Sequence, residues 1–213
     1  MSFNKLFYEK VNWGEMLTAV PPYIADYLKA ETEFFRKHFP KGAILDVGCG
    51  TGRTLFELKE AIEQGHGIDI SLKSIQRCKR ILPHYSFVVG SITHPPYPDS
   101  FFDAVIFSFN LLGNLNSEKV RAFEETRRIL KPEGILLFSV YSEHAQQIQE
   151  RFYRTVPLSK DVESGEGYTS MRTEYGPLRS ERFTKKSLEN LLGNELVLVE
   201  NPFTYFGKVK VKK

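Results

Sequence analysis

Residues 46–52 read Asp-Val-Gly-Cys-Gly-Thr-Gly and follow a short apolar run, residues 43–47, that is typical of a buried parallel strand. A helical pattern begins at residue 51. Glycines at such a junction let the backbone turn tightly and approach a ligand without interference from a Cβ atom. The first N–H groups of the following helix are free to bind that ligand. The stretch therefore predicts a ligand-binding turn in an α/β domain.

Asp69 stands at the end of the next predicted strand, residues 66–70, and comes 21 residues after Gly48. A carboxylate at this spacing can accept hydrogen bonds from both hydroxyls of a ribose. Asp69 could also be the N-cap of the helix after it, but its spacing from the glycines favours the ribose. The turn and the carboxylate together predict a cofactor of the adenosine type, bound at the carboxyl ends of the strands.

The spacing of the glycines argues against a dinucleotide. A dinucleotide-binding turn reads G-x-G-x-x-G, and its third glycine would fall at position 53. This chain has Arg53 there, and its glycines follow the pattern G-x-G-x-G. A hydride-transferring dehydrogenase is therefore the least favoured of the functions that we consider.

The rest of this region alternates between predicted strands and helices. Strands are expected at residues 43–47, 66–70, 86–89, 103–109 and 135–140, and helices at 23–39, 51–63, 71–81 and 117–130. Ser71 and Ser117 are the expected N-caps, and residues 131–134 an expected turn. The alternation predicts a doubly wound α/β fold with a parallel sheet and right-handed crossovers.

Two further strands are predicted near the C-terminus, at residues 195–200 and 203–211, with only Asn201 and Pro202 between them. A connection this short permits an antiparallel hairpin but no parallel crossover. We therefore expect a mostly parallel, Rossmann-like sheet of seven strands with one antiparallel strand near the C-terminus. The alternation of lysine and valine in the tail, residues 208–213, indicates a half-buried edge strand.

The alternation stops between Tyr141 and this hairpin. Helices are expected at residues 144–154 and 187–192, and residues 157–178 have the pattern of an irregular insertion. We interpret residues 1–213 as a single domain, with residues 1–40 as an N-terminal helical cap.

The composition limits the classes of partner and the cellular compartments that we expect for this protein. The net charge of +3 argues against a nucleic-acid surface over the whole protein, although a local basic patch remains open. Cys49 and Cys78, the two cysteines, have neither CxxC nor zinc-ligand spacing, so we expect no metal and a reducing compartment. No apolar run approaches the roughly 18 residues of a membrane span, so a cytoplasmic location is expected.

Four segments together resemble the class I methyltransferases. Residues 46–52 are similar to the family's motif I, whose usual form is D/E-x-G-x-G-x-G, and residues 67–71 (Gly-Ile-Asp-Ile-Ser) to its second motif. Residues 101–106 resemble the start of the family's fourth strand, and residues 127–137 its helix–turn–strand signature. The resemblance covers residues 41–141 in the family's order and spacing. It implies S-adenosylmethionine as cofactor and in-line methyl transfer as reaction.

The resemblance also implies the residues that bind the cofactor. They are Asp46, Gly48, Cys49, Gly50, Gly52, Asp69, Ile70, Ser91, Ile92, Ser108, Phe109 and Asn110. Asp46 and the glycines would surround the methionine half, Asp69 would hold the ribose and Ile70 would pack on the adenine. The family often has an Asp after the third strand that contacts the adenine amine. This chain has Ser91 there, which could make a weaker hydrogen bond.

Residues 94–97, His-Pro-Pro-Tyr, resemble the N/D-P-P-Y motif of enzymes that methylate exocyclic amines of bases. That motif follows the fourth strand, whereas this segment precedes it and begins with His. We interpret it as a loop that its prolines keep extended. A general base is needed only if the nucleophile arrives protonated. Tyr141, Glu143 and His144 are candidates, and for each a surface or packing role is equally compatible with the sequence.

Aromatic and arginine residues outside the five-strand region are the candidates for substrate binding. They are Tyr8, Trp13, Tyr23, Tyr141, Tyr175 and Arg179. An insertion at residues 142–182 that covers the substrate would suit a small molecule with an anionic or flat group, while a solvated loop is an equal alternative. A small-molecule acceptor is preferred. An RNA or protein methyltransferase and a non-catalytic S-adenosylmethionine-binding protein stay open, as does the oligomeric state; no membrane partner is expected.

Overall fold

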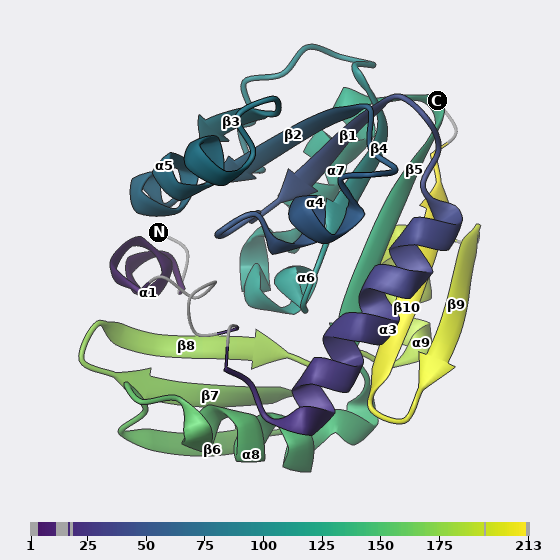
Figure 1. The fold of residues 1–213 in the computed structure, drawn as a ribbon. Helices are drawn as coiled ribbons and strands as arrows, with labels where there is room; N and C mark the ends of the chain where they lie inside the picture. Colours follow the sequence, from purple (N-terminus) through teal and green to yellow (C-terminus); the bar gives the residue numbers. More distant parts are fainter. Residues whose placement is uncertain (1–3, 12–16, 18, 194, 212–213) are drawn as a thin grey trace.

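The computed structural model describes residues 4–11, 17, 19–193 and 195–211. Its main sheet has seven strands in the order β3-β2-β1-β4-β5-β10-β9 (Figure 1). The strands are β1 Ala43–Val47, β2 Gln64–Asp69, β3 Ser86–Val89, β4 Phe102–Phe107, β5 Leu130–Tyr141, β9 Leu196–Asn201 and β10 Thr204–Lys210. β10 runs antiparallel to both of its neighbours, and the other pairs are parallel. The predicted fold class is therefore confirmed.

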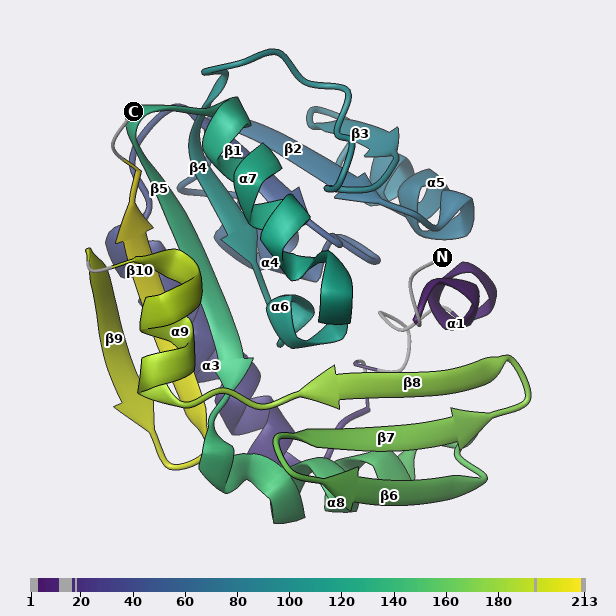
Figure 2. The same ribbon diagram turned by 180° about the vertical axis from the view of Figure 1, so that it is seen from behind.

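Helices cover both faces of this sheet (Figures 1 and 2). On one face lie α3 (Pro22–His38), α4 (Arg53–Leu58) and α5 (Leu72–Ile81), and on the other α7 (Lys119–Ile129) and α9 (Lys185–Leu192). The short helix α6 (Leu111–Asn114) and the turn η1 (Asn116–Glu118) lead from β4 to α7. Each face buries its own apolar cluster, as expected for strands that are apolar throughout. Among helices in the described ranges, none is long and apolar enough to cross a membrane.

Of the two N-caps predicted from the sequence, one is confirmed and one is wrong. Ser71 is the N-cap of α5, and its Oγ accepts a hydrogen bond from Ser74 N at 3.3 Å. The prediction for Ser117 is wrong, because η1 intervenes and α7 begins at Lys119 with Glu118 as N-cap. The turn expected at residues 131–134 lies inside β5, where Glu133 has a φ of +65° and the pairing with β4 shifts register.

Residues 208–210 do not form an edge strand, which corrects that prediction for the part of residues 208–213 that β10 includes; residues 212 and 213 lie outside the described residues. β10 lies between β5 and β9, so β9 is the edge of the sheet. The alternation in β10 is nevertheless present, since Val209 is buried and Lys210 is exposed. An interior strand with one covered face and one partly covered face produces the same pattern as an edge strand.

Residues 157–178 are not irregular, which corrects another prediction. After η2 (Glu143–Ala145) and α8 (Gln146–Thr155), the chain forms an antiparallel sheet of β6 (Asp161–Gly165), β7 (Tyr168–Thr173) and β8 (Gly176–Glu181). Glycines with positive φ, Gly167 and Gly176, stand at its two tight connections. We call these three strands the small sheet. Both views place it below the carboxyl ends of the main strands, with α1 (Lys5–Lys10) between β8 and α5.

Candidate cofactor site

A cavity of about 660 Å³ lies at the carboxyl ends of β1, β2, β3 and β4. This is the position at which open α/β sheets bind their ligands. Of the residues predicted from the sequence, those that line it are Gly48, Cys49, Gly50, Asp69, Ile70, Ser91, Ile92, Ser108, Phe109 and Tyr8. The structure thus brings together residues of the glycine turn, of the segments at the ends of β2, β3 and β4, and of the first helix.

The glycine turn has a backbone that few other residues adopt. Gly48, Gly50 and Gly52 have φ values of +62°, +52° and +84°. A Cβ at Gly48 would lie 3.0 Å from Leu111 Cδ1, so the narrow approach between turn and α6 also requires a glycine. Gly52 is the N-cap of α4 and is not among the described residues that line the cavity. Its place is structural, since a Cβ there would lie 3.2 Å from Cys78 Sγ.

Asp69 is held in place by two backbone amides. Gly50 N donates to one carboxylate oxygen at 2.9 Å, and Ser71 N donates to the other at 2.8 Å. Burial raises the pKa of Asp69, and these two hydrogen bonds act against that shift. Each oxygen keeps lone pairs for a further donor, so the fixed carboxylate can accept hydrogen bonds from a pair of neighbouring hydroxyls.

Asp46 is a buried carboxylate without a partner. It is fully buried at the end of β1, and neither of its oxygens has a hydrogen-bond partner among the described residues. Burial raises its pKa well above the ordinary value, and Arg53 works against that rise. Asp46 lies behind the cavity wall rather than in it. A buried carboxylate left unpaired costs free energy that a nearby cationic group offsets.

A second buried carboxylate, Glu31, connects the N-terminal helix to the site. From α3 it accepts hydrogen bonds from Phe109 N at 2.6 Å and from Ser139 Oγ, and it pairs with Arg53 at 2.5 Å. Arg53 itself lines the cavity and also pairs with Glu57 at 3.0 Å. Sequence reasoning missed Glu31. The available signal was a glutamate on the apolar face of the predicted helix, four residues after Tyr27 and four before Phe35.

The three residues that follow β4 were all predicted to bind the cofactor, but they do not all line the cavity. Ser108 and Phe109 line the cavity, whereas Asn110 does not. Asn110 has a φ of +59°, and its side chain accepts from Tyr141 N at 3.0 Å. Its amide donates to Ser180 Oγ at 2.7 Å and to the carbonyl of Glu181 at 3.1 Å. Asn110 therefore ties β8 of the small sheet to β5.

Of the predicted substrate residues, only Tyr8 lines the cavity among the residues described. Burial raises the pKa of Tyr8 well above its usual value. Tyr141 is buried beside Tyr27, with ring centroids 5.6 Å apart. The remaining candidates lie elsewhere: Tyr23 contacts Arg151 (4.9 Å to the ring centroid), Arg179 lies over the Tyr168 ring at 3.8 Å, and Tyr175 is in the loop before β8. Trp13 lies outside the described residues.

The small sheet holds elements that line the cavity. Asn4, nearly fully buried, donates to the carbonyls of Asn114 at 2.8 Å and Arg179 at 2.7 Å, and it accepts from Arg179 N at 2.8 Å. These bonds join the start of α1 to α6 and β8. None of residues 142–182 is among the described residues that line the cavity. A substrate-covering role for this segment therefore stays a prediction.

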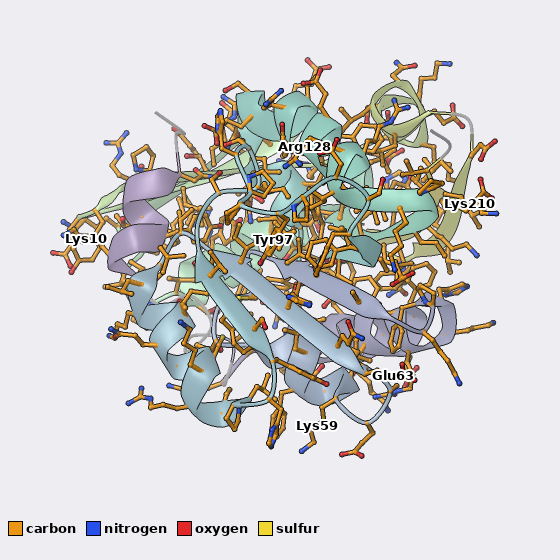
Figure 3. All side chains as sticks on the ribbon, turned by 90° about the horizontal axis from the view of Figure 1, so that it is seen from above. Lys10, Lys59, Glu63, Tyr97, Arg128 and Lys210 are labelled. Carbon is orange, nitrogen blue, oxygen red and sulfur yellow. The ribbon has the colours of Figure 1, made fainter. Side chains whose placement is uncertain are left out.

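The His-Pro-Pro-Tyr segment is a loop, as interpreted. Arg128 on α7 donates to the carbonyl of Tyr97 at 2.9 Å and to that of Pro95 at 3.3 Å (Figure 3). The ring of Tyr97 packs against Phe102, with centroids 4.9 Å apart. Arg128 and this packing keep the loop along α7, ahead of β4.

The fold and the site define an α/β domain with a cavity at the carboxyl ends of its strands, whose lining suits an adenosine-type ligand. Residues 44–134 match a family model described as a methyltransferase domain. The chain is 36% identical over 103 residues to a demethylmenaquinone methyltransferase of Renibacterium salmoninarum, covering 48% of this chain and 43% of the relative. It is 33% identical over 122 residues to malonyl-[acyl-carrier protein] O-methyltransferase 1 of Coxiella burnetii, covering 56% and 40%. The chain spans about two fifths of the length of these curated relatives.

A solved structure of DhpI in complex with SAM and HEP has the same fold, with a TM-score of 0.72, 19% identity and 97% of each chain covered. Over residues 44–134 the chain therefore matches the methyltransferase-domain family. The resemblance noted in the sequence is thereby confirmed.

Proposed function

We propose that this protein transfers a methyl group from S-adenosylmethionine to a small-molecule acceptor. The observation that carries the proposal is the pairing of a glycine turn with Asp69, whose two oxygens are held by Gly50 N and Ser71 N at the edge of the cavity. This arrangement fits a ribose with two free hydroxyls beside a backbone that approaches the ligand closely. The family match over residues 44–134 supports it.

The charged residues suit the amino-acid end of the cofactor. Asp46, unpaired and buried behind the turn, is placed to stabilise an ammonium group. Arg53 is the only Lys or Arg among the described residues that line the cavity, and it suits a carboxylate. When bound, S-adenosylmethionine supplies a methyl group already activated by its sulfonium. The chain's own task is then to align the acceptor and to exclude water.

The cavity favours a small acceptor. Its volume of about 660 Å³ accommodates the cofactor and a further molecule of modest size. Tyr8 in α1 and Val11 at its C-terminal end also line the cavity. With Arg53 as its sole described Lys or Arg, the lining lacks the set of basic side chains that a nucleic-acid backbone requires. The curated relatives named above act on a demethylmenaquinone and on a malonyl-[acyl-carrier protein], so these compounds are the first acceptors to test.

Calorimetric titration with S-adenosylmethionine, S-adenosylhomocysteine and NAD tests the proposal. We expect both sulfur compounds to bind and NAD not to bind. Asp69→Ala should weaken binding of S-adenosylhomocysteine by roughly tenfold or more, because two hydrogen bonds to a charged group are lost. Asp26→Ala, at an exposed position of α3, is the control that should bind like the parent. A preference for NAD, or equal binding by the Asp69 variant, would overturn the proposal.

A further inference from the structure

The nucleoside end of the cavity contains an unpaired carboxylate that sequence reasoning did not find. The inference drawn from it rests on the proposed function. If Asp69 holds the ribose, the purine lies past Ile70, between the ends of β2 and β3. The lining residues of that end are Ser74, Val89, Gly90, Ser91, Ile92, Thr93 and His94.

The hydroxyl groups in this wall are already engaged with one another. Ser91 Oγ and Thr93 Oγ1 are hydrogen-bonded at 2.9 Å, and Thr93 N donates to Ser91 Oγ at 3.2 Å. His94 Nδ1 lies 3.2 Å from Thr93 Oγ1, within hydrogen-bond distance. Ser91, the residue that replaces the family's Asp, thus stabilises its own loop. It is poorly placed to be the main partner of a purine.

Glu118 lines the same cavity from the turn η1. It ends η1, one helical turn before Arg121, whose Nε donates to the carbonyl of Thr93 at 3.4 Å. This contact places the start of α7 beside the loop that follows β3. The Glu118 carboxylate is half-buried and makes no side-chain hydrogen bond or ion pair with the residues that the structure describes.

Neighbouring cations do not neutralise Glu118, because they are paired with other carboxylates. Lys119 pairs with Glu181 at 2.6 Å, and Arg121 pairs with Glu125 at 2.5 Å. A second hydrogen-bond acceptor in the cavity wall also lacks a partner: Asn114 Oδ1 is buried and unbonded among the described residues. These two acceptors lack a donor among the described residues, and a ligand that carries N–H groups would satisfy them.

We propose that Glu118 accepts a hydrogen bond from the exocyclic amine of the cofactor's adenine and so selects adenine over hypoxanthine. Glu118 takes the role that the resemblance assigns to an Asp at the position of Ser91, from the other wall of the pocket. A hypoxanthine has a carbonyl oxygen in place of that amine. Its oxygen would face the carboxylate and leave both groups without a donor, which a site built for an amine rejects strongly.

The test compares S-adenosylhomocysteine with S-inosylhomocysteine, its deaminated analogue, by calorimetry. We expect the parent protein to bind the adenosine compound roughly tenfold more tightly or better. Glu118→Gln should reduce the preference to about threefold or less, because the Gln amide can accept from an amine or donate to a carbonyl. Glu124→Gln, which removes the same charge from an exposed position of α7, should leave it unchanged.

Each outcome decides a separate question. Equal binding of the two compounds by the parent, or an unchanged preference in Glu118→Gln, would overturn the role of Glu118. Binding of neither compound would instead contradict the proposed function, because the whole nucleoside would then be unrecognised. Glu118→Ala gives a second test of the same residue, with a thermal melt to confirm that the variant is folded. A preference retained in both variants would assign the selection to another group.

Discussion

The main sheet and the small sheet are stabilised in opposite ways. β1 in the main sheet buries all five of its residues, of which Asp46 is the one polar member. β7 in the small sheet buries four of its six residues, and three of these are polar: Thr169, Ser170 and Thr173. The main sheet therefore depends mainly on apolar burial, and the small sheet depends on hydrogen bonds between polar side chains.

Arg182 is the centre of those hydrogen bonds. Its guanidinium is largely buried and donates to Thr169 Oγ1 at 2.6 Å, Gly165 O at 2.8 Å and Gln149 Oε1 at 3.1 Å. The bonds join β6, β7 and α8 in one place. Such a cluster satisfies buried polar groups without the hydrophobic periodicity from which strands are predicted.

The largest effect is expected beside the main sheet, where the buried Glu31 of α3 bonds to Ser139 of β5 and to Arg53. Glu31→Ala would leave Phe109 N and Ser139 Oγ without this acceptor and would leave Arg53 paired with Glu57 alone. We expect it to lower the free energy of unfolding by about 3–5 kcal/mol, measured by urea denaturation. Glu33→Ala, exposed on the same helix, should change it by less than about 0.5 kcal/mol. A similar small change in both variants would show that the network contributes little.

Arg182→Met should destabilise the small sheet and leave the stability of the main sheet unchanged. The loss of the guanidinium leaves several buried acceptors unpaired, which costs about 2–3 kcal/mol. We expect hydrogen exchange of the amides in β6, β7 and β8 to accelerate, while amides of β1 and β4 keep their protection. Arg172→Met, at an exposed position of β7, is the matched control. Equal acceleration in both sheets would mean that they unfold as one unit.

Asp46 should make the stability of the unliganded protein depend on pH. Its pKa is raised by burial above the ordinary value of 3.8, so the folded state binds the proton more tightly than the unfolded state. The contribution of Asp46 to the free energy of unfolding is therefore most favourable below pH 3.8. It becomes less favourable as the pH rises from 3.8 toward the raised pKa of the folded state. The slope approaches about 1.4 kcal/mol per pH unit within that window.

Urea denaturation of the parent and of Asp46→Asn across this pH range gives the free energy of unfolding of each. The difference between their pH dependences is the contribution of Asp46. The variant should lose that part of the slope, and Asp26→Asn at an exposed site should keep it. Parallel curves for the parent and Asp46→Asn would contradict the assignment.

The smallest effect concerns the two serines predicted as caps. Ser71→Ala removes the acceptor of Ser74 N and should lower the free energy of unfolding by about 1 kcal/mol. Ser117→Ala should have almost no effect, because Ser117 is exposed, lies in η1 and does not occupy the N-cap position of α7. A thermal melt of both variants is sufficient. Equal losses would show that the start of α7 depends on Ser117 after all.

Features that depend on local sequence pattern could be predicted, and features that depend on distant contacts or on polar strands could not. The glycine turn directly follows the buried strand β1, and Asp69 ends the next strand only 21 residues after Gly48, so local pattern and spacing were enough to predict them. Glu31, which pairs with Arg53, and Glu118, which lines the cavity, are far from the turn in the sequence, so local spacing did not point to them. Asn110 occupies a predicted position, yet its side chain is directed to the small sheet. The strands at 161–181 were missed because their buried positions hold Thr and Ser, which a search for apolar alternation does not detect.

The placement of Glu31 also bears on how this domain could be cut. The region matched by the family model begins at residue 44 and ends at 134, so it omits α3, which carries Glu31, and the part of β5 that carries Ser139. A fragment with those limits would contain the glycine turn but not the carboxylate that holds Arg53 and Phe109 N. The smallest excisable unit that keeps this network therefore starts before Pro22 and ends after Lys210, because β10 is needed to pair with β5.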